Sequence, residues 1–178
     1  MASDASDFTV LTPDMRAVIR SAHLCFAASV TAEGFPNLSP KGTIRIWDDR
    51  HLFFLDIASP GTRANLAVHP WMELNVVDQL SRRGYRFFGR ASLHASGETF
   101  EKAVSIVIGE EKARYPVASV VMLEVKRAAP LVSPGYWNVL DEHAMRASWR
   151  ERRAALDREF EEHIATQGAF RVKTEGET

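Results

Sequence analysis

The chain has 178 residues, of which 46% are apolar and 25% are charged. This length and apolar content predict one globular domain with a sizeable core, and they exclude a chain that is disordered over most of its length. Lysine and arginine together number 22 against 23 acidic residues, which leaves a formal net charge of -1. We therefore expect no global positive field that recruits nucleic acid or an anionic membrane, and any anion site must be local.

The first seven residues are small and acidic, so they lack the basic and apolar regions of a signal peptide. No apolar run approaches membrane-spanning length. We expect a cytoplasmic protein without a membrane partner, in which residues 1–11 form a flexible leader. The one cysteine, Cys25, lies in an apolar run and is expected to be a buried, inert thiol, so no disulfide can form within the chain.

The first predicted element is a helix that begins at Thr12, whose hydroxyl can cap it before the proline that follows. Apolar residues then recur at helical spacing as far as residue 22. Strands are predicted at residues 24–31 and 38–47, and the turn at Gly34 joins them as a β-hairpin. This part of the chain therefore supplies one covering helix and two paired strands.

A third strand is predicted at residues 51–57. A helix of about two turns then begins at Thr62 and ends before Pro70, because proline disfavours helical geometry in the residue before it. Apolar and polar residues alternate at positions 72–76 and again at 85–93, which indicates two half-buried strands.

Apolar residues from position 100 to 108 follow helical spacing, and Gly109 is predicted to cap the carboxyl end of that helix. Residues 117–126 are predicted to form the sixth strand. A long charged helix runs from about residue 141 to 166, with an apolar stripe made of Met145, Trp149, Leu156, Phe160 and Ile164. This helix packs either on the rest of the domain or on a partner.

Six strands with alternating faces, short turns and only local helices predict a mainly β fold with flanking helices, either an antiparallel barrel or a sandwich. Residues 12–140 form this domain, and residues 141–178 form a charged amphipathic helix and tail. No Gly-x-Gly-x-x-Gly motif, nucleophile elbow or close histidine pair is present, so we expect no Rossmann fold, no hydrolase triad and no metal site.

Two polar stretches flank the third strand, at residues 37–42 and 59–66. If the strands form a meander, both stretches can face one cleft. The first offers Lys41 and hydroxyls, and the second offers Thr62 and Arg63 at a helix start, where free N–H groups and an arginine suit a phosphate. A phosphorylated cofactor between the strands is the favoured interpretation. Lys41 could instead be a solvated lysine of an edge strand, and Thr62 and Arg63 could be no more than a cap and a surface arginine.

The order of short motifs from Phe26 to about Leu93, with Ser-Pro-Lys-Gly and Ser-Pro-Gly-Thr-Arg-Ala-Asn-Leu at its centre, resembles the pyridoxamine 5'-phosphate oxidase-like family of FMN-binding split barrels. The resemblance implies a six-stranded antiparallel split β-barrel and a homodimer with FMN at the subunit interface. It places the ring beside one set of residues and the phosphate beside Thr62 and Arg63, with Arg83 near the point from which the facing subunit reaches the cofactor. The residues implied to lie at the ring are Ser39, Pro40, Lys41, Gly42, Asp56 and Ile57.

Authentic oxidases of this family carry an arginine and a lysine on the second strand, where this chain has Ser39 and Ile44. We therefore expect an FMN-dependent oxidoreductase of a divergent branch that does not oxidise pyridoxamine phosphate and that uses a small-molecule electron donor or acceptor. Lys41 would stabilise negative charge that arrives on the ring, and no catalytic acid or base can be named. Two alternatives stay open: a non-catalytic carrier or sensor of flavin, deazaflavin or haem, and an interaction protein with an empty site.

Overall fold

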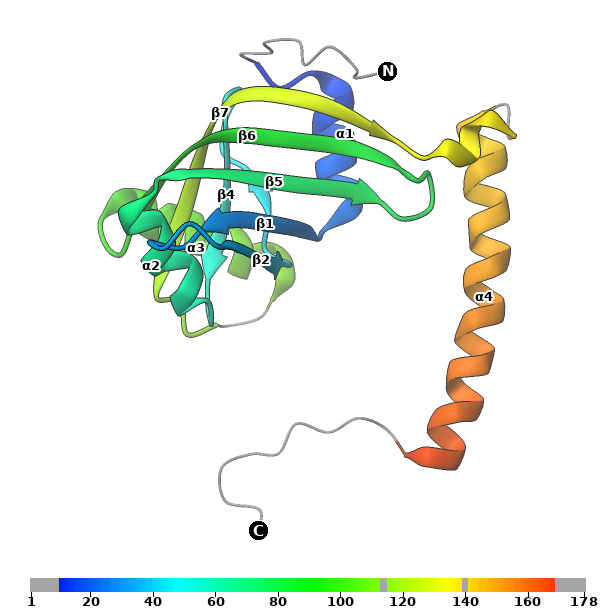
Figure 1. Cartoon of the computed structure of the whole chain (residues 1–178). Helices are drawn as coiled ribbons and strands as arrows, with labels where there is room; N and C mark the ends of the chain where they lie inside the picture. The colour runs from blue at the N-terminus through cyan, green and yellow to red at the C-terminus, as the bar shows by residue number, and fades with distance from the viewer. Residues whose placement is uncertain (1–9, 113–114, 139–140, 169–178) are drawn as a thin grey trace.

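The computed structural model describes residues 10–112, 115–138 and 141–168, and these form a curled antiparallel sheet with helices around it (Figure 1). The strands of the sheet are β1 (Cys25–Val30), β2 (Pro36–Lys41), β3 (Arg45–Ile46), β4 (His51–Asp56), β5 (Trp71–Asp78), β6 (Arg83–His94) and β7 (Ser119–Val132). The helices are α1 (Pro13–Ala22), α2 (Pro60–Val68), α3 (Glu98–Glu111), the 3-10 helix η1 (Pro134–Trp137) and α4 (Glu142–Gln167). The architecture is the expected mainly β split barrel with flanking helices, but the sheet of the described residues has seven strands and not the six predicted.

The strand order in the sheet is β2-β1-β5-β6-β7-β4-β3. β2 and β3 lie at opposite ends of this order although only residues 42–44 separate them in the chain, so the sheet must curl until its two edges approach each other. The prediction of one strand at 38–47 is therefore wrong: the chain leaves one edge of the sheet at Gly42 and joins the other. The hydroxyl of Thr43 holds this crossing in place, since it accepts from the Leu55 N–H at 2.9 Å.

β7 continues six residues beyond the predicted end at residue 126, because it pairs with β6 as far as Arg83 opposite Val132. The register between the two strands shifts at Phe88 and Gly89. A Cβ atom at Gly89 would lie 2.0 Å from the Glu124 carbonyl oxygen, so only glycine fits at this bulge.

The main core fills the inside of the curled sheet, and α1 covers it with Met15, Val18 and Ile19, as predicted. Thr12 caps α1 by accepting from the Met15 N–H at 3.3 Å. Cys25 is fully buried in this core, and burial raises the pKa of its thiol to about 12, which confirms an inert cysteine. A smaller apolar cluster lies under α3, between that helix and strands β4 and β7.

Two helix boundaries differ from the predictions. α2 begins at Pro60 and not at Thr62, since proline at the first helical position suits a helix start. α3 passes through Gly109 and ends at Glu111, with Lys112 as its cap in the left-handed region at φ 52°, so Gly109 is not the cap. Of the predicted leader, residues 1–9 lie outside the described residues, whereas Leu11 is buried in the core. Within the described ranges, no helix has the length and apolar content needed to cross a membrane.

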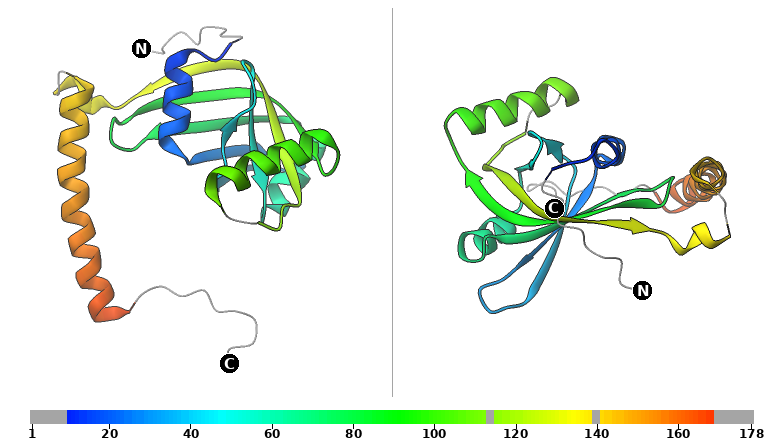
Figure 2. Two further views of the ribbon diagram at one scale, coloured as in Figure 1. Left: turned by 180° about the vertical axis from the view of Figure 1, so that it is seen from behind. Right: turned by 90° about the horizontal axis from the view of Figure 1, so that it is seen from above.

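α4 extends away from the barrel as a separate arm, and both views of Figure 2 show it apart from the sheet. It begins at the predicted position, where Asp141 accepts from the Ala144 N–H at 2.8 Å. Met145 is its one buried residue. The structure therefore leaves most of the predicted apolar stripe without a partner in the described chain.

Candidate functional site

A cleft with a volume of about 550 Å³ opens between the end of β2, the crossing to β3 and the loop that leads from β4 into α2. Its walls are made of Ser39, Pro40, Lys41, Gly42, Thr43, Leu55, Ile57, Ala58, Ser59, Glu111 and Tyr115. The volume lies within the range of about 300–1,000 Å³ that is typical of small-molecule sites. Five of the six residues that the resemblance placed at the ring line this cleft, and Asp56 does not. Of the second polar stretch only Ser59 lines it, so Thr62 and Arg63 lie outside its walls.

Lys41 supplies the charge of the cleft. The residue is 4% exposed, and its Nζ donates to the Ser39 hydroxyl at 2.5 Å and to the Ser59 hydroxyl at 2.6 Å. No carboxylate pairs with it among the residues that the structure describes, and burial lowers the pKa of its ammonium despite the attraction of Asp56. A buried cation held only by neutral hydroxyls is costly, so its third N–H is available to an anionic or carbonyl group in the cleft.

Asp56 lies behind the cleft rather than on its surface. It is 1% exposed, accepts from the Ser59 N–H at 3.0 Å and pairs with Arg63 at 3.1 Å. The carboxylate thus fixes the loop that carries Ser59 and orients the guanidinium of α2 at the same time. Arg63 is half-exposed, which leaves the outer part of its fork free.

The N-terminus of α2 has free backbone donors. Ser59 is its cap residue but makes no side-chain capping bond, because its hydroxyl accepts from Lys41 instead. Among the described residues no acceptor meets the N–H of Gly61 or Thr62, and the Thr62 side chain is buried. This end of the helix therefore has the two N–H groups and the positive partial charge that bind phosphate.

Sequence reasoning missed the outer wall of the cleft, formed by Glu111 and Tyr115. The Tyr115 hydroxyl donates to Glu111 at 2.7 Å, and this bond raises the pKa of the phenol. Arg45 also pairs with Glu111, at 2.7 Å. These residues lie some 70 positions from Lys41 in the chain, and no local motif marks them; only the packing of α3 brings them to the site.

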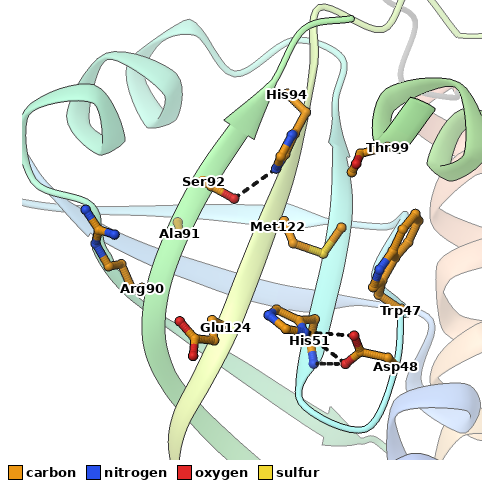
Figure 3. Close-up of a pocket in the computed structure, with 10 residues that line it drawn as sticks. All are labelled: Trp47, Asp48, His51, Arg90, Ala91, Ser92, His94, Thr99, Met122 and Glu124. Carbon is orange, nitrogen blue, oxygen red and sulfur yellow. Dashed lines mark hydrogen bonds and ion pairs between the residues drawn. The ribbon is translucent and has the colours of Figure 1, made fainter. Parts of the chain in front are cut away.

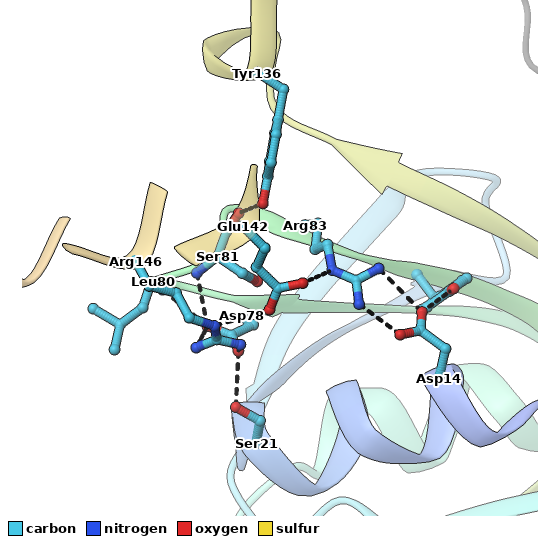
Figure 4. A network of polar contacts seen from close by, with 10 residues as sticks. Asp14, Ser21, Asp78, Leu80, Ser81, Arg83, Tyr136, Glu142 and Arg146 are labelled. Carbon is cyan, nitrogen blue, oxygen red and sulfur yellow. Dashed lines mark hydrogen bonds and ion pairs between the residues drawn. The ribbon is translucent and has the colours of Figure 1, made fainter. Parts of the chain in front are cut away.

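The structure does not bring Arg83 to this cleft within one chain. Its guanidinium pairs with Asp14 at 2.5 Å and with Glu142 at 2.8 Å, at the base of α4 (Figure 4). Arg146 of α4 pairs with Asp78 at 2.5 Å in the same network. Arg83 therefore joins three parts of its own chain, and a role toward the cofactor of a second subunit stays a prediction.

A second cleft of about 330 Å³ lies on another face of the barrel, beside Trp47, Arg90 and Met122 (Figure 3). Its two histidines already have partners: His51 contacts the Asp48 carboxylate at 2.9 Å, and His94 contacts the Ser92 hydroxyl at 2.9 Å. It holds no buried cation comparable to Lys41. No group of three metal-ligating side chains is found in the described ranges, at this cleft or elsewhere.

The pyridoxamine 5'-phosphate oxidase family model matches residues 11–130, and this chain belongs to the pyridoxamine 5'-phosphate oxidase-like family. The match covers the barrel and the whole of the cleft, but it ends before α4. No protein with a curated function matches the sequence significantly.

Three solved structures show the same fold. HupZ from Group A Streptococcus is 30% identical, with a TM-score of 0.62 over 68% of this chain and 94% of its own. An FMN-binding protein from Syntrophomonas wolfei is 14% identical, with a TM-score of 0.55 over 67% and 90% of the two chains. HutZ, the haem storage protein from Vibrio cholerae, is 16% identical, with a TM-score of 0.51 over 69% and 94%. At the two lower identities the likeness concerns the fold alone.

Proposed function

We propose that this protein is an FMN-dependent oxidoreductase that binds FMN in the cleft between β2 and the N-terminus of α2. The observation that carries the proposal is the buried ammonium of Lys41, which has two hydroxyl partners and no carboxylate partner among the described residues. Such a charge is costly while only neutral hydroxyls face it and favourable once an electron-rich ring lies beside it. Membership of the family and the fold of an FMN-binding protein support flavin as the ligand.

The donors in the cleft and at the neighbouring start of α2 suit the two ends of FMN. The free N–H groups of Gly61 and Thr62 and the fork of Arg63 suit the phosphate. Lys41 and the open backbone at Gly42, where a Cβ atom would meet nothing within 4 Å, suit the polar edge of the ring. Bound FMN would supply the hydride and electron transfer chemistry.

The residues of this chain would set orientation and charge. The Asp56 carboxylate holds Arg63 and the Ser59 loop in place, so the phosphate site and the ring site are fixed relative to each other. Lys41 would stabilise negative charge on the ring through a preorganised, desolvated N–H group. Tyr115 closes one side of the cleft, where its hydroxyl donates to Glu111 at 2.7 Å.

A second copy of the chain would complete the site. Phe26 and Val30 of β1 and Leu38 of β2 are 44%, 39% and 66% exposed, and the β1–β2 register places all three on the same outer face of the sheet. Pro40 belongs both to this face and to the wall of the cleft. An exposed apolar face of this kind marks an interaction surface. We infer a homodimer in which the partner covers this face and one side of FMN.

FMN titration of the apo protein, followed by flavin fluorescence and by the visible spectrum after removal of excess ligand, tests the proposal. Wild-type protein retains a flavin band, and Arg63→Ala weakens binding about 10–100-fold, since a charge-assisted hydrogen bond contributes about 1.5–3 kcal/mol. Arg20→Ala, which removes an exposed arginine of α1, is the matched control and leaves binding unchanged.

Bleaching of the bound flavin by a reduced nicotinamide establishes the oxidoreductase activity. A flavin band that no donor bleaches would limit the protein to a carrier or sensor. A Soret band in the isolated protein would mean that the ligand is haem and not flavin. Equal FMN affinities of the wild-type and Arg63→Ala proteins would refute the phosphate site.

A further inference from the structure

α4 is a long helix that is anchored at one end only. Its 26 residues span about 39 Å at 1.5 Å per residue. The Arg83 and Arg146 ion pairs and the buried Met145 hold its first turn against the barrel (Figure 4). Beyond that turn, Leu156 and Phe160 are 48% and 59% exposed. Trp149 contacts Arg82 of the β5–β6 turn at 4.2 Å, but the half of the helix that carries Leu156 and Phe160 is exposed, and such a helix end is marginal in water. This part of the apolar stripe therefore calls for a partner.

The two aromatic residues of the stripe are placed symmetrically about the middle of the helix. The midpoint lies between Ala154 and Ala155, and Trp149 precedes it by the distance at which Phe160 follows it. Met145 and Ile164 have the same relation, but Met145 is already buried against its own barrel and is not available to a second copy. If a second copy of α4 ran antiparallel about this midpoint, Trp149 of each copy would lie at the level of Phe160 of the other, whereas Leu156 would lie at the level of Arg153.

The charges of α4 change sign at the same midpoint. Residues 146–153 contain four arginines and one glutamate, whereas residues 157–162 contain four carboxylates and one arginine. Two helices in parallel would bring like charges together, and two antiparallel helices bring the basic half of each against the acidic half of the other. Opposite charges along the flanks of an apolar seam select orientation in this way.

On a helical wheel, Arg150 and Asp157 lie on one side of the stripe, and Arg152 and Glu159 lie on the other side. In the antiparallel arrangement Arg150 approaches Asp157 of the partner subunit, and Arg152 approaches Glu159 of the partner subunit, each within one helical turn. Within this part of the helix Asp157 also pairs with Arg153. Both side chains of that pair are exposed, so it competes only weakly with the pairing of Asp157 and an arginine of the partner subunit.

We infer that α4 pairs with α4 of a second copy of this chain as an antiparallel helix pair centred between Ala154 and Ala155. Trp149 then packs against Phe160 of the partner subunit. A hollow of about 130 Å³ beside Trp149 and Leu156, closed on its other side by Leu80 and Arg82 of the β5–β6 turn, receives that ring. The inference does not depend on FMN, because no residue of the β2–α2 cleft takes part.

Disulfide crosslinking tests the pairing. In the double variant Trp149→Cys/Phe160→Cys, the two cysteines of one helix are about 16 Å apart and cannot join each other, because a disulfide needs Cα atoms less than about 7 Å apart. Across the antiparallel pair they are adjacent. The native Cys25 is buried and does not interfere. Oxidation of the apo protein is expected to yield a covalent dimer that runs as a monomer after reduction.

Each single variant alone stays monomeric on a non-reducing gel. In the control double variant Glu151→Cys/Arg158→Cys, the two cysteines are also equally far from the midpoint of the helix, but they lie on the side opposite the apolar stripe. This control is expected to stay monomeric as well. A dimer from Trp149→Cys alone would mean parallel helices, and an equal dimer from the control would mean random collision. No dimer from the double variant would mean that another surface covers the stripe. Any of these results overturns the inference.

Charge exchange provides a second measurement in the same cysteine background. Arg150→Glu/Arg152→Glu is expected to slow dimer crosslinking about tenfold at low salt, because several attractive pairs become repulsive. Adding Asp157→Arg/Glu159→Arg restores the rate. The control Arg20→Glu/Arg50→Glu changes the net charge equally on exposed barrel residues and leaves the rate unchanged. If the crosslinking rate is the same in the charge variants as in the parent double-cysteine protein, the antiparallel charge match is wrong.

Discussion

Replacing Lys41 by methionine should weaken FMN binding and stabilise the folded protein. Methionine keeps an unbranched, flexible side chain and removes the charge. FMN affinity should fall about 10–100-fold, which corresponds to the loss of one charge-assisted hydrogen bond of about 1.5–3 kcal/mol. The free energy of unfolding of the apo protein at pH 7 should rise by on the order of 1 kcal/mol, since a 4% exposed ammonium without a carboxylate partner no longer has to be desolvated. The hydroxyls of Ser39 and Ser59 can turn to water in the open cleft or to each other.

The same variant should change the pH dependence of stability. Burial lowers the pKa of Lys41 in the folded state, so between that pKa and the ordinary value of about 10.4 the unfolded chain binds more protons than the folded one. The free energy of unfolding of the wild-type protein therefore rises with pH in this interval. In Lys41→Met this contribution is absent, and the stability gain over the wild type shrinks as the pH approaches 10.

Urea denaturation at pH 7 to 10 and FMN titration measure both effects. Lys126→Met, which removes an exposed lysine paired with Glu124, is the control and should change neither quantity. If Lys41→Met lowered the free energy of unfolding while FMN affinity stayed the same, Lys41 would be a structural residue and the proposed ring site would be wrong.

Three further predictions concern the fold. Asp14→Asn should lower the melting temperature at pH 7, and the difference from wild type should shrink below about pH 4; the Arg83 hydrogen bond holds the Asp14 pKa low, and its stabilisation is lost as the carboxylate is protonated. An unchanged difference at acidic pH would contradict this. Gly89→Ala should destabilise the protein by at least about 2 kcal/mol, because the new Cβ atom meets the Glu124 carbonyl; a neutral result in urea denaturation would disprove the close approach. Gly109→Ala should stabilise it by about 0.5–1 kcal/mol, since this glycine lies inside α3 with open space around it, whereas a loss of stability would mean that the helix ends there.

Periodicity and turn residues were sufficient to predict the β1–β2 hairpin, α1 and α4, because in each case one face is apolar and the ends carry caps or turn residues. The break between β2 and β3 could not be predicted. Ile44 and Ile46 continue the apolar pattern of the strand before them, so the sequence reads as one strand. Which edge of a sheet a strand joins depends on pairing with distant strands, and here β3 pairs with β4.

The candidate cleft was foreseen in part for the same reason. Lys41 and Ser59 lie on the two sides of one strand in the sequence, and a meander brings such neighbours together. Glu111 and Tyr115 reach the cleft through the packing of α3, which no local signal encodes. The partners of Arg83 depend on where α4 meets the barrel, so a charged turn residue that looked free in the sequence has two carboxylate partners in the fold.

The crossing at residues 42–44 has a consequence for folding kinetics. β2 can pair with β1 early, because only a short turn separates them, but β4 reaches its neighbour β7 only after a loop of more than 60 residues has closed. The wall of the cleft made by Glu111 and Tyr115 belongs to the second event, because it reaches the site only when α3 packs on β4 and β7. The ligand site is therefore assembled in a late step, so the ligand can slow unfolding of the finished barrel but cannot act as a template for its formation.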